Sequence, residues 1–273
     1  MYNHSYGLTI QYHTQVIDRA INKFSTSNFM LPTCSMPGVL LFSGRWRLGG
    51  NKEIIRLYKH NLITPYNLDV VFGAAQSQLC TPQITPRAFS KIVQLQWNMH
   101  TRRFRSFLIS SKDHDVHIPE LSSSSTLALT PWKLFMINNW RVQFHHLRLT
   151  LEHALQWKLH TFYVRCRFDM LLLNRPSFNV NLLKDNVYVM NHTSHLPFHP
   201  LVMDWFYVAS LRAMSIMTDT RHALFNVSER CHAACPEEQL VMQLQRRSLT
   251  YLRTHVILKR IPKDIWCTSN GDS

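Results

Sequence analysis

Three charged residues stand close together in an otherwise apolar segment between Tyr163 and Leu173: Arg165, Arg167 and Asp169. Burying such side chains costs free energy unless each of them finds a partner. Because the segment has the composition of a buried strand, charges near its end indicate a binding site for an anionic ligand or a metal ion. The alternative is an ion pair that these residues form among themselves inside the fold.

A long stretch with helical periodicity precedes this segment. Thr130 is suited to cap a helix, Pro131 is suited to its first position, and apolar residues then recur every three or four positions to near His160. The pattern predicts a helix that leads directly into a strand at residues 163–173.

A first strand–helix–strand unit is predicted earlier in the chain. Residues 39–42 and 69–73 have the composition of buried strands, and apolar residues recur at helical spacing between residues 51 and 62. Repetition of this order predicts an α/β fold with a mostly parallel sheet flanked by helices. The remaining predicted elements are a strand at 93–97, a strand at 187–190, a helix from Pro236 to about Tyr251, and a strand at 255–261.

The length and composition fit one α/β domain. A chain of 273 residues with 45% hydrophobic residues can build a sizeable core. We expect an N-terminal extension at residues 1–36, with one helix around 15–23, a single domain at 37–262 and a tail at 263–273. No apolar run approaches the roughly 18 residues that cross a bilayer, and the first residues lack the pattern of a secretory signal. We therefore expect no transmembrane segment and a cytoplasmic location.

The chain is strongly basic. Its 30 Lys and Arg against 16 Asp and Glu give a formal net charge of +14. An anionic partner is expected, although charge alone does not distinguish nucleic acid, anionic lipid and a nucleotide diphosphate. The six cysteines indicate reduced thiols rather than a disulfide framework. Cys231 and Cys235, with histidines nearby, leave a zinc site open as an alternative to ordinary thiols.

Four segments, taken in order, resemble motifs of one family: the small glycosyltransferases of GT-A type found in bacterial surface-polysaccharide clusters, large DNA viruses and some eukaryotes. Residues 40–47 resemble its opening strand and the arginine-containing turn after it, and residues 61–72 resemble the entry to its second strand. Residues 163–172 resemble its central strand with arginine and aspartate. Residues 204–210, with residues 236–240 further on, resemble its aromatic segment and a later helix.

The resemblance implies a GT-A-like, Rossmann-type fold that moves a sugar from a nucleotide-sugar donor to a hydroxyl of a glycan or lipid-linked acceptor, in polysaccharide biosynthesis. It also implies a catalytic role for Asp204 and a metal-binding role for Asp169. The residues that it implies for donor binding are Gly44, Arg47, Asp69, Arg165, Arg167 and Asp169. Where many such enzymes carry an Asp-x-Asp motif, this chain has a single carboxylate, in Arg167-Phe168-Asp169.

The chemistry of such a reaction requires these residue types. The diphosphate leaves as the glycosidic bond forms, so positive charge or a metal ion is needed where negative charge develops. Arg47, with Arg165 or Arg167, would supply it at the carboxyl ends of two strands. Asp169 could hold Mn²⁺ or Mg²⁺ together with the diphosphate and water, or could hydrogen-bond the donor without a metal. Asp204 would take the proton of the acceptor hydroxyl.

Other functions stay open. Residues 100–105, HTRRFR, place arginines around Phe104, which could stack on a base while the arginines bind phosphates. The main alternative is therefore a basic nucleic-acid-binding protein without enzymatic activity, although a run of charges is more often a solvated face. Peripheral contact with an anionic membrane is compatible with a glycosyltransferase. The aromatic residues 205–207 could form a wall for a sugar ring but are more often part of a core.

Overall fold

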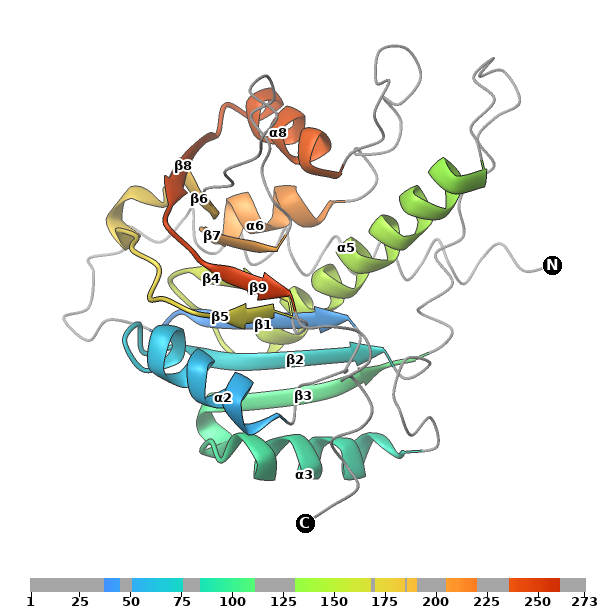
Figure 1. The fold of residues 1–273 in the computed structure, drawn as a ribbon, viewed down its shortest axis with the longest axis vertical. Helices are drawn as coiled ribbons and strands as arrows, with labels where there is room; N and C mark the ends of the chain where they lie inside the picture. The colour runs from blue at the N-terminus through green and yellow to red at the C-terminus, as the bar shows by residue number, and fades with distance from the viewer. Residues whose placement is uncertain are drawn as a thin grey trace.

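A seven-stranded mixed sheet lies at the centre of the computed structural model, in the order β3-β2-β1-β4-β7-β6-β8 (Figure 1). A separate two-stranded sheet pairs β5 with β9. The structure describes residues 37–44, 51–75, 84–110, 131–167, 170–184, 186–190, 205–219 and 236–260. The strands are β1 (Val39–Gly44), β2 (Asp69–Ala75), β3 (Phe104–Ile109), β4 (Tyr163–Cys166), β5 (Met170–Leu172), β6 (Asn186–Met190), β7 (Phe206–Ala209), β8 (Thr250–Thr254) and β9 (Leu258–Arg260).

The predicted α/β fold with a mostly parallel sheet is confirmed. Strand β1 pairs in parallel with β2 on one side and with β4 on the other, and β2 pairs in parallel with β3. Strand β7 is antiparallel to both of its neighbours, β4 and β6, while β8 is parallel to β6. The first strand–helix–strand unit therefore forms as the sequence predicts.

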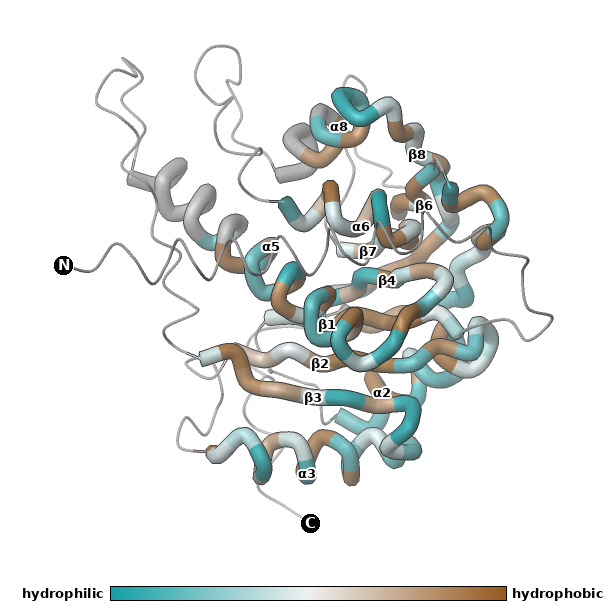
Figure 2. Tube along the Cα trace, turned by 180° about the vertical axis from the view of Figure 1, so that it is seen from behind, coloured by the Kyte–Doolittle hydropathy of each residue, from teal (hydrophilic) through white to brown (hydrophobic). Residues whose placement is uncertain are grey.

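Helices cover both faces of the sheet. The helices are α2 (Lys52–Tyr58), its π-helical continuation η1 (Lys59–Ile63), α3 (Pro86–Trp97), α5 (Pro131–Trp157), α6 (Leu211–Thr218) and α8 (Pro236–Arg246), with short 3-10 turns η3 (Thr101–Arg103) and η4 (Val180–Leu182). Leu40 and Phe42 of β1 face α2 and α3, whereas Val39 and Leu41 face α5, α6 and α8. In the view from behind, α5 runs across the sheet near β1 and β2 (Figure 2). None of the described helices is both long and apolar enough to cross a membrane.

The strand predicted at residues 93–97 is wrong, because these residues belong to helix α3. Thr85 caps this helix by accepting a hydrogen bond from the backbone N–H of Ala88, and Pro86 follows at the first helical position. Phe89, Val93 and Trp97 recur every four residues and are buried. The helical period thus outweighs the alternation of three apolar residues over a short window.

The segment 163–173 is also not one strand as predicted. It divides into β4, in the main sheet, and β5, which pairs antiparallel with β9. The helix before it, α5, is confirmed. Which sheet a strand joins depends on partners far away in the sequence, so a continuous apolar run does not reveal such a break.

The last third of the domain agrees with the prediction in part. Strand β6 and the start of α8 are confirmed, but α8 ends at Arg246, and Tyr251 lies in β8 instead of on the helix. The final strand is shorter than predicted, and helix α6 was not predicted. The predicted N-terminal extension, its helix, the C-terminal tail, and Cys231 and Cys235 lie outside the described residues.

Candidate functional site

The strand order identifies the edge of the sheet where a ligand is expected. The first strand of the sheet along the chain is β1. The next two, β2 and β3, add on one side of it, and β4 then adds on its other side. In open α/β sheets, ligands bind at the carboxyl ends of the strands where this reversal occurs. We call the end of β1 and β4, with Ser43, Gly44, Cys166 and Arg167, the carboxyl edge. The opposite end, where β1 to β4 begin, is the amino edge.

Two residues of β1 lie at the carboxyl edge. Gly44 has a φ angle of 114°, a backbone conformation that residues with a side chain rarely adopt. A Cβ atom there would meet no atom within 4 Å, so the backbone angle and not crowding favours glycine. The hydroxyl of Ser43 is buried, and the described residues offer it no hydrogen-bond partner. Among these residues, the edge therefore has a buried hydroxyl free to bond next to a glycine.

Arg165 is the most unusual residue at this edge. It is only 3% exposed and lies in β4 between Leu41 of β1 and Tyr207 of β7. Its Nη1 donates to the carbonyl oxygen of Cys166 at 2.8 Å. The described residues offer it no carboxylate partner, and Asp169, the acidic residue of the ion pair considered above, lies outside them. By strand alternation it shares the α5 face with Ser43.

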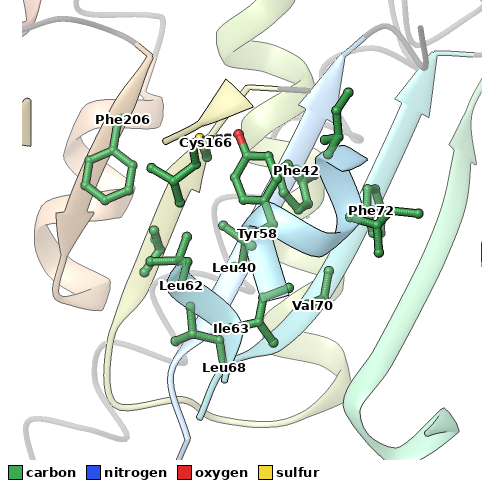
Figure 3. Packing of buried hydrophobic residues seen from close by; sticks show 14 of the residues in the cluster. Leu40, Phe42, Tyr58, Leu62, Ile63, Leu68, Val70, Phe72, Cys166 and Phe206 are labelled. Atoms are coloured by element: carbon green, nitrogen blue, oxygen red, sulfur yellow. Dashed lines mark hydrogen bonds between the residues drawn. The ribbon is translucent and has the colours of Figure 1, made fainter. Parts of the chain in front are cut away.

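Tyr58 of α2 forms hydrogen bonds with the backbone at the end of β4 and the start of β5. Arg167 directly follows β4. The Tyr58 hydroxyl lies 2.9 Å from Sγ of Cys166 (Figure 3). The same hydroxyl lies 3.1 Å from the carbonyl oxygen of Arg167 and 3.2 Å from that of Met170. Asn61 adds a hydrogen bond of 2.8 Å to the backbone of β5. One helix thus holds both sides of the segment that carries the predicted site residues.

Helix α5 closes the other face of the sheet at very short range. A Cβ atom on Gly73 of β2 would lie 2.4 Å from Oγ1 of Thr150 and 2.8 Å from a ring carbon of Phe107. The hydroxyl of Thr150 is itself held by a bond of 2.7 Å to the carbonyl oxygen of His146. A residue without a side chain at position 73 therefore allows α5 to pack against the strand.

Asp69, which the resemblance groups with donor-binding residues, lies at the amino edge. It begins β2 opposite Val39, whereas Gly44 lies opposite Ala74 at the far end of the same strand pair. The structure therefore does not bring Asp69 together with Gly44 and Arg165. Asp69 precedes the apolar residues of β2 and so lies at the start of that strand, whereas Gly44 follows the apolar residues of β1 and lies at its end.

Three cationic or ionisable side chains surround the buried carboxylate of Asp69. Oδ2 lies 2.5 Å from Nζ of Lys158 and 3.2 Å from Nε2 of His160, and Oδ1 lies 3.4 Å from Nε of Arg103. Arg103 also donates to the carbonyl oxygen of Leu68 at 2.8 Å. Sequence reasoning missed this cluster. Its signal is that basic or histidine residues directly precede β3 and β4, whose starts meet the start of β2 at one edge.

The cluster shifts the pKa of two groups. Burial raises the pKa of the Asp69 carboxyl, but hydrogen bonds from His160 and Lys158, with the charge of Lys158, outweigh it and bring the pKa below its usual value. Burial lowers the pKa of His160 more than the neighbouring carboxylate raises it. The imidazole is therefore neutral at pH 7 and donates from Nε2 to Asp69.

The remaining predicted residues fall into two groups. Phe206 and Tyr207 are completely buried, so they belong to the core, and Trp205 beside them packs against it. Arg47, Asp169 and Asp204 lie outside the described residues. Of the described residues nearest to them in the chain, Gly44 and Arg167 belong to the carboxyl edge. Trp205 lies beside this edge, because the next residue, Phe206, pairs with Cys166.

The described residues contain no group of three or more His, Cys, Asp or Glu side chains that could hold a metal ion. A scan against protein-family models finds no match for this chain, and a search of curated proteins finds none either.

Proposed function

We propose that this chain is a glycosyltransferase that moves a sugar from a nucleotide-sugar donor to a hydroxyl group of a glycan or lipid-linked acceptor, in polysaccharide biosynthesis in the cytoplasm. One observation carries the proposal: the buried guanidinium of Arg165 lies near the carboxyl edge, where the described residues offer it the carbonyl oxygen of Cys166 and no carboxylate. A guanidinium has five N–H donors in a planar fork that matches phosphate oxygens. A diphosphate at this edge would supply acceptors for these N–H groups and a negative charge beside the guanidinium.

The bond changes of the proposed reaction use the residues of this edge. The bond between the anomeric carbon of the sugar and the diphosphate oxygen breaks, and a bond from the same carbon to the acceptor oxygen forms. Arg165 and Arg167 would stabilise the negative charge that develops on the leaving diphosphate. The hydroxyl of Ser43 would donate a hydrogen bond to it, and Asp204 would receive the proton of the acceptor hydroxyl.

A divalent cation at this site would depend on Asp169. Mn²⁺ and Mg²⁺ prefer oxygen ligands, and the described residues provide no metal-binding group of their own. Asp169, the donor diphosphate and water would therefore complete the ligand set, and the ion would add positive charge beside the leaving group. The position of Tyr58 supports this arrangement, because its hydroxyl restrains the backbone on both sides of residues 168 and 169.

The test combines binding and turnover. Thermal unfolding is followed with UDP, GDP and CMP, and sugar release is measured with the corresponding nucleotide sugars, with and without Mn²⁺. Arg165→Leu should weaken nucleotide binding by roughly 10- to 100-fold, the usual loss for hydrogen bonds to a charged group. Arg175→Leu is the matched control, because it makes the same change at an exposed arginine away from the carboxyl edge. Arg175 lies near Tyr66, and Tyr66 belongs to the loop before β2. Failure of every nucleotide to raise the unfolding temperature, together with no turnover of any donor, would disprove the proposal.

A further inference from the structure

Four basic residues lie at the amino edge of the sheet, two of them against the ring of Trp157. Arg102 and Arg103 come from η3, Arg105 comes from β3, and Lys158 follows the last residue of α5. We call these four residues and Trp157 the amino-edge basic surface. Arg102 and Arg105 are exposed, and 41% of the Arg103 side chain and 35% of the Lys158 side chain are exposed.

Trp157 holds two of these cations in fixed positions. Cζ of Arg105 lies 4.8 Å from the centre of its ring, and Nζ of Lys158 lies 4.7 Å from it. Lys158 also donates to the carbonyl oxygen of Arg102 at 3.4 Å. Cations that are already ordered lose less conformational entropy when they bind an anion.

The negative charge within this cluster is too small to balance it. Asp69 is the acidic partner that the described residues offer, and it bonds to Lys158 and Arg103 from a position that is 1% exposed. Arg102 and Arg105 form no ion pair in the described part of the chain. Four positive charges against one leave an excess of three, which attracts a polyanion.

We propose that the amino-edge basic surface binds single-stranded nucleic acid through its phosphates. Guanidinium groups match phosphate oxygens, and single strands bind along grooves lined with such cations. The aromatic residue first expected to stack on a base, Phe104, is 4% exposed and packs on Phe72 in the core. The aromatic residue of this surface is Trp157, which orders Arg105 and Lys158.

An anionic membrane fits this surface less well. A membrane-binding surface normally inserts apolar side chains beside its basic ones. The large apolar side chains that are exposed in the described part lie on α3, near β5 and β9, and on η4: Ile92, Leu95, Leu173, Leu182 and Ile257. None of them belongs to η3, β3 or the end of α5. The proposal does not rest on the glycosyltransferase function, since the amino edge lies at the other end of the strands from the carboxyl edge.

The test measures fluorescence anisotropy of labelled single-stranded DNA and RNA of about 20 nucleotides with the full chain, between about 50 and 200 mM salt. Contacts to three or four phosphates predict a slope of log K against log salt of about −2 to −3. Arg102→Gln with Arg105→Gln should reduce the steepness by about 1.4, the contribution of two phosphate contacts. Trp157→Leu should weaken binding, because Arg105 and Lys158 lose the ring that orders them.

A control variant removes the same charge elsewhere. Lys91→Gln with Lys259→Gln changes two exposed lysines on α3 and β9, and it should leave the slope unchanged. Circular dichroism confirms that each variant is folded. Absence of binding at 50 mM salt, or equal slopes for the arginine and lysine variants, would overturn the proposal. Binding to phosphatidylserine vesicles without binding to either oligonucleotide would overturn it as well, in favour of a membrane surface.

Discussion

Replacing Asp69 with asparagine removes the single negative charge from the centre of a cationic cluster while keeping the shape of the side chain. Breaking a buried ion pair by removing one partner typically costs about 3–5 kcal/mol. Here the cations left behind regain water, because 41% of the Arg103 side chain and 35% of the Lys158 side chain are exposed. His160 stays neutral and leaves no buried charge. We therefore expect Asp69→Asn to lower the free energy of unfolding by about 2–3 kcal/mol at pH 7.

The pH dependence separates the charge from the shape of the side chain. The pKa of Asp69 in the fold is lowered, since hydrogen bonds and positive charge outweigh the effect of burial. A lowered pKa means that the ionised carboxylate stabilises the fold above its unfolded value of about 3.9. This stabilisation is lost as the pH falls through the folded pKa. The difference between wild type and Asp69→Asn should therefore narrow steadily below about pH 4.

Urea unfolding followed by circular dichroism at pH 7, 5, 4 and 3 measures this difference. Glu53→Gln is the matched control: Glu53 pairs with Arg56 at 2.7 Å, but both side chains are more than half exposed. Its removal should change stability little at any of these pH values. Equal stability of Asp69→Asn and wild type at pH 7, or a difference that persists unchanged at pH 3, would refute the argument that the buried charge stabilises the fold.

Three further changes test other parts of the structure. Gly73→Ala should lower the free energy of unfolding by about 1–3 kcal/mol, because its Cβ would lie 2.4 Å from Oγ1 of Thr150, and adding Thr150→Ala should recover part of the loss in urea unfolding. Burial lowers the pKa of His160, so as the pH falls the unfolded chain is protonated at this residue before the folded chain. The wild type should therefore lose stability below about pH 6.5. His160→Gln should remove this loss when unfolding temperatures at pH 7.5 and 5.5 are compared. Tyr58→Phe should lower the free energy of unfolding in urea by about 1–2 kcal/mol, since the Tyr58 hydroxyl forms hydrogen bonds with the backbone between β4 and β5. An unchanged free energy of unfolding would show that these hydrogen bonds do not stabilise the fold.

Local patterns predicted elements well where one period dominated. The strands at β1 and β2 and the helix α5 follow directly from apolar runs and from caps such as Thr130 and Pro131. The same cap signature stands before α3, at Thr85 and Pro86, and would have corrected the false strand at residues 93–97. A short window of alternating residues fits both periods, so the start signal is the better guide there.

The candidate site was predicted in part for a topological reason. Gly44 ends β1 and Arg165 lies one residue before the end of β4, so both lie toward the carboxyl ends of these parallel strands once β1 and β4 are paired. The split between β4 and β5 could not be predicted, because it depends on β9, nearly 90 residues later, and on the hydroxyl of Tyr58. The grouping of Asp69 with Gly44 follows a motif and ignores the end of the strand at which each residue stands.

The two edges of the sheet handle buried charge in opposite ways, and the contrast indicates where a ligand belongs. At the amino edge, the carboxylate of Asp69 has two cationic partners, Arg103 and Lys158, and a neutral imidazole partner, His160, so its burial is compensated within the chain. At the carboxyl edge, the guanidinium of Arg165 has one carbonyl and no described carboxylate. An uncompensated buried ion costs several kcal/mol, and sequences keep such costs chiefly where a function needs them. Under the proposed function, a bound anion would compensate the buried charge of Arg165, so this residue would contribute to the stability of the complex.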